Sequence, residues 1–210
     1  MSLTLKQSPR HTEFRFDPGN HEYWYDERRI VSVTEAIGDL IDYSRAPPEA
    51  VEYKRQIGKA LDTCIVLGDS LDPETVDPAV LPYFNGYRQF CLDTGFVMLE
   101  TQCPRYHFKY DYAGTHDQIG IMKKELVLLD TKCVAVYHPA TALQTSSYAE
   151  LWDQHQHRRD KIQHRFALVL KPDARYELIE HTDRTDLHVF LSCLNRYLWR
   201  IKHGLTSRTI

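Results

Sequence analysis

Two aspartates and a lysine lie at the ends of the most apolar stretch of the chain. Asp117 stands near the start of this stretch, Asp130 closes it, and Lys132 follows two residues later. Because side chains alternate along a strand, Asp130 and Lys132 would share one face, with Thr131 on the other. A carboxylate at the end of a buried strand is costly to desolvate unless a positive charge lies beside it. Lys132 supplies one such charge, and a bound cation would supply more.

The segment MKKE, residues 122–125, reads as the turn of a hairpin that brings the two aspartates together. Asp117 and Asp130 are about equally far from this turn, so antiparallel pairing would place them nearly opposite one another. Two opposed carboxylates repel unless they share a proton or a metal, and oxygen-only ligands suit Mg²⁺ or Mn²⁺. The spacing alone is common, and an ordinary surface hairpin with an Asp–Lys ion pair is the alternative.

The elements that must hold these residues follow from the periodicity of apolar positions. An aromatic–polar alternation with the turn DPGN predicts a hairpin over 11–31, and Ser32 or Thr34 is a candidate cap for the short helix after it. Longer helices are predicted over 50–67, 76–93, 140–159 and 185–202, and strands over 96–103, 106–122, 125–133, 166–171 and 176–181. This order predicts one mixed α/β layer structure with helices on the faces of its sheet.

Composition bounds the class of protein. A chain of 210 residues fits one domain with a substantial core, and its net charge of −3 argues against a protein that simply coats nucleic acid. No stretch approaches the roughly 18 apolar residues that cross a bilayer, and the first residues lack the apolar segment of a signal peptide. We therefore expect a cytoplasmic protein without membrane contact. The cysteines are five, scattered and without a CxxC pair, which predicts reduced thiols.

Three ordered motifs carry a resemblance to a known family. The chain contains a G-x-x-D segment at Gly114–Asp117, a D-x-K segment at Asp130–Lys132 and a Q-x-x-x-Y segment at Gln144–Tyr148. In this order they resemble the PD-(D/E)XK nuclease superfamily, in particular its RecB-type and phage-exonuclease branches. The resemblance covers roughly 95–155 by motif and extends more loosely to both sides. The three motifs and the apolar strand before D-x-K are together specific for this superfamily, whereas each of these four elements alone is not.

The resemblance implies a fold, an activity and partners. The fold would be a restriction-endonuclease-like α/β core with a mixed central sheet, in a single domain of residues 1–210: an N-terminal hairpin and helices (1–94), a catalytic core (95–182) and a C-terminal helix (183–210). The activity would be that of a Mg²⁺- or Mn²⁺-dependent DNA exonuclease in phage-type recombination or DNA processing, in the host cytoplasm if the chain is phage-encoded. A structure- or sequence-specific endonuclease and a non-catalytic DNA-binding relative are the alternatives. DNA is the expected substrate, a single-strand annealing or recombination protein is a candidate partner, and homo-oligomers remain open.

The resemblance also assigns roles to residues. Asp117, Asp130 and Lys132 would be catalytic, the two aspartates and the backbone carbonyl of Thr131 would bind metal, and Glu100 on the first core strand matches an acidic residue that some members carry. The chain departs from the pattern in two places: a histidine replaces the proline before Asp117, and Asp62 stands where the RecB branch has a metal-binding histidine. Asp62 could ligate metal or face solvent, and Glu100 could be a ligand or a strand-edge glutamate.

The Q-x-x-x-Y pair and the basic segment 155–165 are candidates for contacts with DNA. Gln144 and Tyr148 are four residues apart on a predicted helix, so both could reach a DNA backbone, or they could lie on a half-buried helix face. The basic segment 155–165 could contact phosphates or form a solvated turn. Some relatives bind an iron–sulfur cluster through cysteines near the C-terminus. Only Cys193 lies beyond the core here, so no cluster is predicted.

Overall fold

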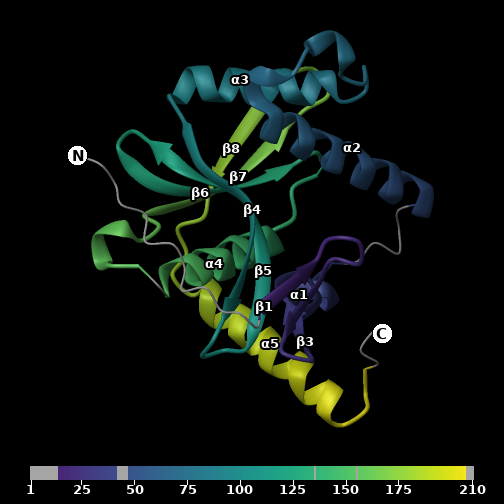
Figure 1. Ribbon diagram of the computed structural model, residues 1–210, viewed down its shortest axis with the longest axis vertical. Coiled ribbons are helices and arrows are strands. Elements are labelled where there is room, and N and C mark those ends of the chain that lie inside the picture. The colour runs from purple at the N-terminus through teal and green to yellow at the C-terminus, as the bar shows by residue number, and fades with distance from the viewer. Residues whose placement is uncertain (1–13, 42–46, 135, 155, 207–210) are drawn as a thin grey trace.

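A mixed β-sheet forms the centre of the molecule in the computed structural model (Figure 1). The structure describes residues 14–41, 47–134, 136–154 and 156–206. The strands are β1 (Phe14–Asp17), β2 (Glu22–Tyr25), β3 (Arg28–Ser32), β4 (Val97–His107), β5 (Tyr112–Met122), β6 (Glu125–Lys132), β7 (His164–Leu170) and β8 (Tyr176–Glu180). They follow the order β1-β2-β3-β5-β6-β7-β8, and β4 pairs with β5.

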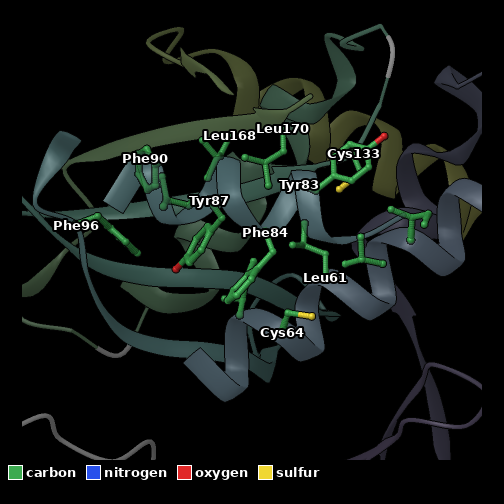
Figure 2. Close-up of a cluster of buried hydrophobic side chains, with 14 of the residues drawn as sticks. Leu61, Cys64, Tyr83, Phe84, Tyr87, Phe90, Phe96, Cys133, Leu168 and Leu170 are labelled. Carbon is green, nitrogen blue, oxygen red and sulfur yellow. The ribbon is translucent and has the colours of Figure 1, made fainter. Parts of the chain in front are cut away.

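Helices cover both faces of this sheet. They are α1 (Val33–Ile37), α2 (Pro48–Leu67), α3 (Leu81–Thr94), α4 (Ala140–Asp153) and α5 (Asp186–Lys202), with short 3-10 turns η1 (Gly38–Leu40), η2 (Gly68–Ser70), η3 (Pro73–Thr75) and η4 (Arg158–Asp160). One core packs α2 and α3 on the sheet, and Figure 2 shows Leu61 of α2, Phe84 of α3 and Leu168 of β7 within it. The second core packs α1, α4 and α5 on the other face. The predicted fold class, a mixed central sheet flanked by helices, is confirmed. Its likeness to restriction endonucleases stays a prediction.

The strands of the central hairpin owe their position to their sequence. In β6, Val127 and Leu129 enter the core under α2 and α3, whereas Leu128 enters the core under α4 and α5. A strand that is apolar on both faces belongs in the middle of a covered sheet. The MKKE turn is confirmed, with Lys123 at φ 52° and Lys124 at φ 72°. A two-residue hairpin turn with positive φ at both residues has a backbone twist that matches the twist of the strands it joins.

The N-terminal segment forms three strands rather than a hairpin alone. β1 and β2 form the predicted hairpin, of which residues 11–13 lie outside the described part, and β3 returns to pair in parallel with β5 at Val31↔Tyr112. Of the two candidate caps, Ser32 is the one used. Its hydroxyl accepts from the Glu35 backbone N–H at 3.1 Å, and the Glu35 carboxylate accepts from the Ser32 N–H at 2.8 Å. This capping box fixes α1 directly after β3.

Several predicted boundaries are wrong by a few residues. Helix α3 begins at Leu81 rather than 76, because a proline occupies its first turn and a backbone turn at 77–80 precedes it. Helix α4 ends at Asp153 rather than 159, since the chain folds back there. The Asp153 carboxylate accepts from the Ile162 N–H at 2.8 Å, and the Trp152 indole donates to the Asp160 carbonyl at 2.9 Å.

Strand β4 is longer and less regular than the sequence predicts. Within the described residues it pairs with β5 alone, and its register shifts at Leu99. Gln102 adopts a left-handed φ of 49°. Both irregularities lie in the half of the strand that approaches the site described below.

In the described part of the chain, no helix is long and apolar enough to cross a membrane. The five cysteines are all free thiols. The division of the chain at residues 94 and 182 stays a prediction.

Candidate active site

The two aspartates lie where strands β5 and β6 separate. The antiparallel register runs from Met122↔Glu125 at the turn to Gln118↔Leu129, so Asp117 and Asp130 occupy the next facing positions. Beyond this point β6 continues beside β7 in parallel. The facing arrangement expected from the sequence is therefore the one found.

Asp130 and Lys132 form the centre of the candidate site. Asp130 is 1% exposed, and Lys132 Nζ lies 2.6 Å from its Oδ2 atom as an ion pair. Among the described residues, neither Asp130 oxygen has a well-aligned hydrogen bond. Asp117 is half-buried, and its Oδ2 accepts from the Thr131 N–H at 2.8 Å. The site therefore contains a buried carboxylate whose hydrogen-bonding capacity is not filled.

Burial raises the pKa of three carboxyl groups at the site. Burial raises the pKa of Asp117 well above its usual range; the Asp130 charge adds to this effect and Lys132 opposes it. Burial also raises the pKa of Asp130, again against Lys132. Burial raises the pKa of Asp62 to about 6, with Lys132 opposing and Asp130 contributing. One lysine does not neutralise three carboxylates, so the site favours binding either protons or a cation.

The donor set fits a hard cation such as Mg²⁺ or Mn²⁺. Asp117 and Asp130 provide oxygen ligands. The two Asp130 oxygens lack aligned hydrogen bonds from the described residues, and a bound cation would satisfy them. No three His, Cys, Asp or Glu side chains converge into a preassembled cluster in the part of the chain that the structure describes. A metal here would complete its shell with water and a backbone carbonyl, which is the usual habit of Mg²⁺.

The structure groups Asp62, but not Glu100, with the two aspartates. Asp62 lies on α2 and lines a cleft of about 350 Å³ together with Lys59 and Gln102. The Glu100 carboxylate instead accepts from Arg105 Nη2 at 2.6 and 2.8 Å. It also lies 3.0 Å from His116 Nε2, close enough for an ion pair although the alignment falls short of a hydrogen bond. Glu100 is thus engaged by the Arg105 guanidinium and lies beside the His116 ring, whose pKa is lowered by burial, and its metal-binding role stays a prediction without support from its position.

The Q-x-x-x-Y pair forms a relay behind Lys132. Lys132 Nζ donates to Gln144 Oε1 at 3.2 Å, and Gln144 Nε2 donates to the Tyr148 hydroxyl at 3.0 Å. Tyr148 is only 5% exposed, which differs from the expectation that both residues reach outward. Its ring packs on Gly114, where a Cβ would lie 2.6 Å from Tyr148 Cε1. The glycine of the first motif therefore admits the tyrosine of the third.

A cleft of about 310 Å³, here called the Lys132 cleft, opens beside this relay. Its lining includes Lys132 and Gln144 at the site and three further polar residues, Thr34, His138 and Thr141. The segment 37–41 and the loop after β6 contribute the rest of the lining: Ile37, Gly38, Ile41, Val134 and Val136. The cleft therefore combines an apolar wall with a cationic end.

Two supporting networks escape sequence reasoning. Tyr87 donates to Gln118 Oε1 at 2.9 Å, and Gln118 Nε2 donates to Thr131 Oγ1 at 3.1 Å, which fixes the strand next to Asp130. His181 lies 2.8 Å from the Tyr137 hydroxyl and 2.7 Å from Thr145 Oγ1, which ties the loop after β6 to α4. Both networks join residues far apart in sequence, and the one available signal was the presence of polar residues within apolar elements.

The predicted basic segment 155–165 is described except for His155. Its last residue, Arg165, is a structural cation. The Arg165 guanidinium donates to the Ala142 and His181 carbonyls and to the Asp186 carboxylate at 3.1, 3.0 and 2.9 Å. Arg165 is therefore engaged within the fold, and a phosphate contact by the rest of the segment stays a prediction.

Comparison with known proteins gives no family assignment. No family model matches the chain, and no curated protein sequence matches it. Among solved structures, the chain is similar to an alkaline exonuclease, LHK-Exo, from Laribacter hongkongensis, with a TM-score of 0.41 and 12% identity over 84% of this chain and 89% of that chain. The structure of LHK-Exo in complex with dAMP gives a TM-score of 0.39 and 13% identity over the same shares.

Proposed function

We propose that this chain is a metal-dependent nuclease that hydrolyses phosphodiester bonds in DNA and acts as an exonuclease. The observation that carries the proposal is Asp130: a fully buried carboxylate without a well-aligned hydrogen bond, facing Asp117 and paired with Lys132. Such a group is costly to keep in a fold unless its charge is used. A phosphodiesterase uses it to hold a divalent cation.

In this proposal, Asp117 and Asp130 hold Mg²⁺ or Mn²⁺ with the Thr131 carbonyl. The bound metal would neutralise charge on the scissile phosphate and stabilise the leaving oxygen. Lys132 Nζ orients the attacking water and favours its deprotonated form, because an ammonium group stabilises a nearby hydroxide. Gln144 Oε1 accepts a hydrogen bond from Lys132 Nζ and so fixes the direction of the ammonium group, while the Tyr148 hydroxyl accepts from Gln144 Nε2 and fixes that amide.

The Lys132 cleft supports attack near a strand end. A cleft of about 310 Å³ lies at the small end of the range for ligand pockets and is walled by α1 and the loop after β6. It suits one nucleotide at a time better than an uninterrupted duplex. A role in phage-type recombination, a single-strand annealing partner and a cytoplasmic location belong to the proposal through the family resemblance alone, as does assembly of several copies around the substrate.

The test is a time course on DNA labelled at the 5′ or the 3′ end, linear or closed circular, in Mg²⁺, Mn²⁺ or EDTA. We expect progressive shortening of linear DNA with either metal, intact circles, and no reaction in EDTA. Metal-dependent nicking of circles would instead identify an endonuclease on the same site. Binding of DNA without hydrolysis in any metal would identify a non-catalytic relative and refute the proposal.

A further inference from the structure

The C-terminal half of α5 presents an aromatic ring among cationic side chains. Trp199 is 56% exposed, and its indole lies 4.5 Å from the His203 ring between centroids. Arg196 and Lys202 are exposed three residues to either side, so they flank the indole on one helix face. We call these four residues the Trp199 surface.

Positive charge predominates on this surface, because Arg196 and Arg200 share a single carboxylate, that of Asp39, and Lys202 adds a further cation. After Asp186 the sequence contains no acidic residue up to its last position. Cations in the last turn of a helix complement its dipole, which accounts for part of the pattern. The dipole gives no reason for an exposed indole among those cations. A positive surface that carries an open aromatic face is the combination that binds single-stranded nucleic acid, with phosphates on the cations and an unpaired base on the ring.

The Trp199 surface adjoins the Lys132 cleft. Asp39 of η1 accepts from Arg196 Nη2 at 2.5 Å and from Arg200 Nη1 at 2.6 Å. The neighbouring Gly38 lines the cleft that contains Lys132. Only one residue of η1 therefore separates the cleft lining from the two arginines, and Figure 1 shows α1 lying against α5.

We propose that the Trp199 surface binds a single strand of nucleic acid where it extends from the Lys132 cleft. This inference deepens the proposed function and rests on it, since the strand is the substrate of that site. Arg196 and Lys202 attract the phosphates, and a base stacks on Trp199. Stacking on an exposed ring requires an unpaired base, so the surface selects single-stranded over duplex nucleic acid.

The direct test is the affinity for a labelled single-stranded oligonucleotide in EDTA, measured by fluorescence anisotropy. Trp199→Ala should weaken binding roughly tenfold, the scale of one lost base stack. Lys202→Ala should lower the slope of log affinity against log salt by about 0.7, the value for one phosphate contact on a single strand. Val189→Ala is the matched control, because Val189 is 45% exposed on the first half of the same helix. It should bind as the unchanged chain does.

Kinetics with metal separate this surface from the cleft. Trp199→Ala should raise KM for a strand of about 16 nucleotides, leave kcat unchanged, and leave a strand of about 4 nucleotides unaffected. Unchanged affinity of Trp199→Ala would overturn the inference even if the chain proves to be a nuclease. The same holds if Trp199→Ala converts a dimer to a monomer without changing DNA affinity. Trp199-dependent binding without hydrolysis in any metal would refute the proposed function and leave the binding surface standing.

Discussion

Two clusters of carboxylates beside the central sheet, called here the aspartate group and the Glu100 group, have opposite electrostatic character. In the first, Asp117, Asp130 and Asp62 share one lysine. Burial raises the pKa of all three, and repulsion from neighbouring carboxylates adds to the effect at Asp117 and Asp62. In the second, burial alone would raise the pKa of Glu100, but His116 and Arg105 outweigh it and lower that pKa to about 2.

Burial acts in the same direction in both groups, so the number of carboxylates that share each set of partners decides the outcome: Lys132 faces three, whereas Arg105 and His116 serve Glu100. The Glu100 group is complete in charge, although Arg105 Nε and His116 Nε2 lack aligned hydrogen bonds within the described part of the chain. Its carboxylate accepts from an arginine whose guanidinium also lies 4.8 Å from the centroid of the Trp152 ring. The aspartate group is one positive charge or more short of balance. A complete group stabilises a fold, whereas an incomplete one can bind a cation and act on a substrate.

The largest effect should come from removing the centre of the incomplete group. Asp130→Ala and Lys132→Ala should each reduce the rate of DNA hydrolysis by about 100-fold to 1,000-fold, the scale of a lost charge-stabilising group. The thermal unfolding midpoint in EDTA should fall little for Asp130→Ala. The variant loses the ion pair with Lys132, but it also removes a buried carboxylate that repels Asp117 and Asp62. Hydrolysis within a few-fold of the unchanged chain would show that the aspartate group is not the active site.

A second test removes the charge of the complete group. Glu100→Gln should lower the free energy of unfolding by about 2–3 kcal/mol, since Arg105 and His116 then remain buried without a carboxylate. Hydrolysis per folded molecule should stay nearly unchanged. Urea denaturation and initial rates measure the two quantities, and a loss of activity as large as that of Asp130→Ala would place Glu100 in the active site after all.

A third test disturbs the support of the aspartate group without touching a carboxylate. Gly114→Ala would press a Cβ against the Tyr148 ring and should cost about 1–3 kcal/mol of stability, as overpacking does. It should also slow hydrolysis, because Tyr148 positions Gln144 and hence Lys132. Gly120→Ala is the control for overpacking, since its Cβ would press on the Val97 carbonyl oxygen and lie 2.5 Å from the Phe96 ring, in the core under α3. It should destabilise the fold without an equal loss of rate; equal losses in both variants would remove the relay from the mechanism.

The smallest expected effect concerns pH. The pKa of Asp62 is raised to about 6, so the folded chain holds this proton more tightly than the unfolded chain. The stability that this bound proton contributes is fully present below the pKa of Asp62 in the unfolded chain, and it is lost as pH rises through about 6. In EDTA, Asp62→Asn should therefore stabilise the chain by about 1–2 kcal/mol near pH 8 and by little near pH 4. Urea titrations at both pH values measure this difference, and a larger gain at low pH would contradict the sign.

The features fixed by local sequence were predictable. The turn at Lys123–Lys124 needs only two residues, so it sets the register of the hairpin and the facing positions of Asp117 and Asp130. The cap at Ser32 is likewise a short-range pattern, with Glu35 three residues later. Such features depend on backbone geometry over a few residues, which sequence patterns describe well.

The features that depend on distant contacts were not predictable. The surroundings of Glu100 include a register shift at Leu99 and the ring of His116 from β5, and neither feature has a sequence signature. The spacing of Gln144 and Tyr148 showed that they share a helix face but not that the tyrosine is buried. The parallel pairing of β3 with β5 joins segments that are remote in sequence, so no local pattern encodes it.

The irregular half of β4 has a consequence for the behaviour of the whole chain at high concentration. Val97 and Leu99 are 59% and 37% exposed on this strand, and a straight, apolar border of a sheet invites a neighbouring chain to add a strand. Here the shift at Leu99, the left-handed Gln102 and Pro104 break the row of backbone donors and acceptors that such addition needs. The irregular backbone of β4 therefore disfavours the addition of a strand at this edge of the sheet.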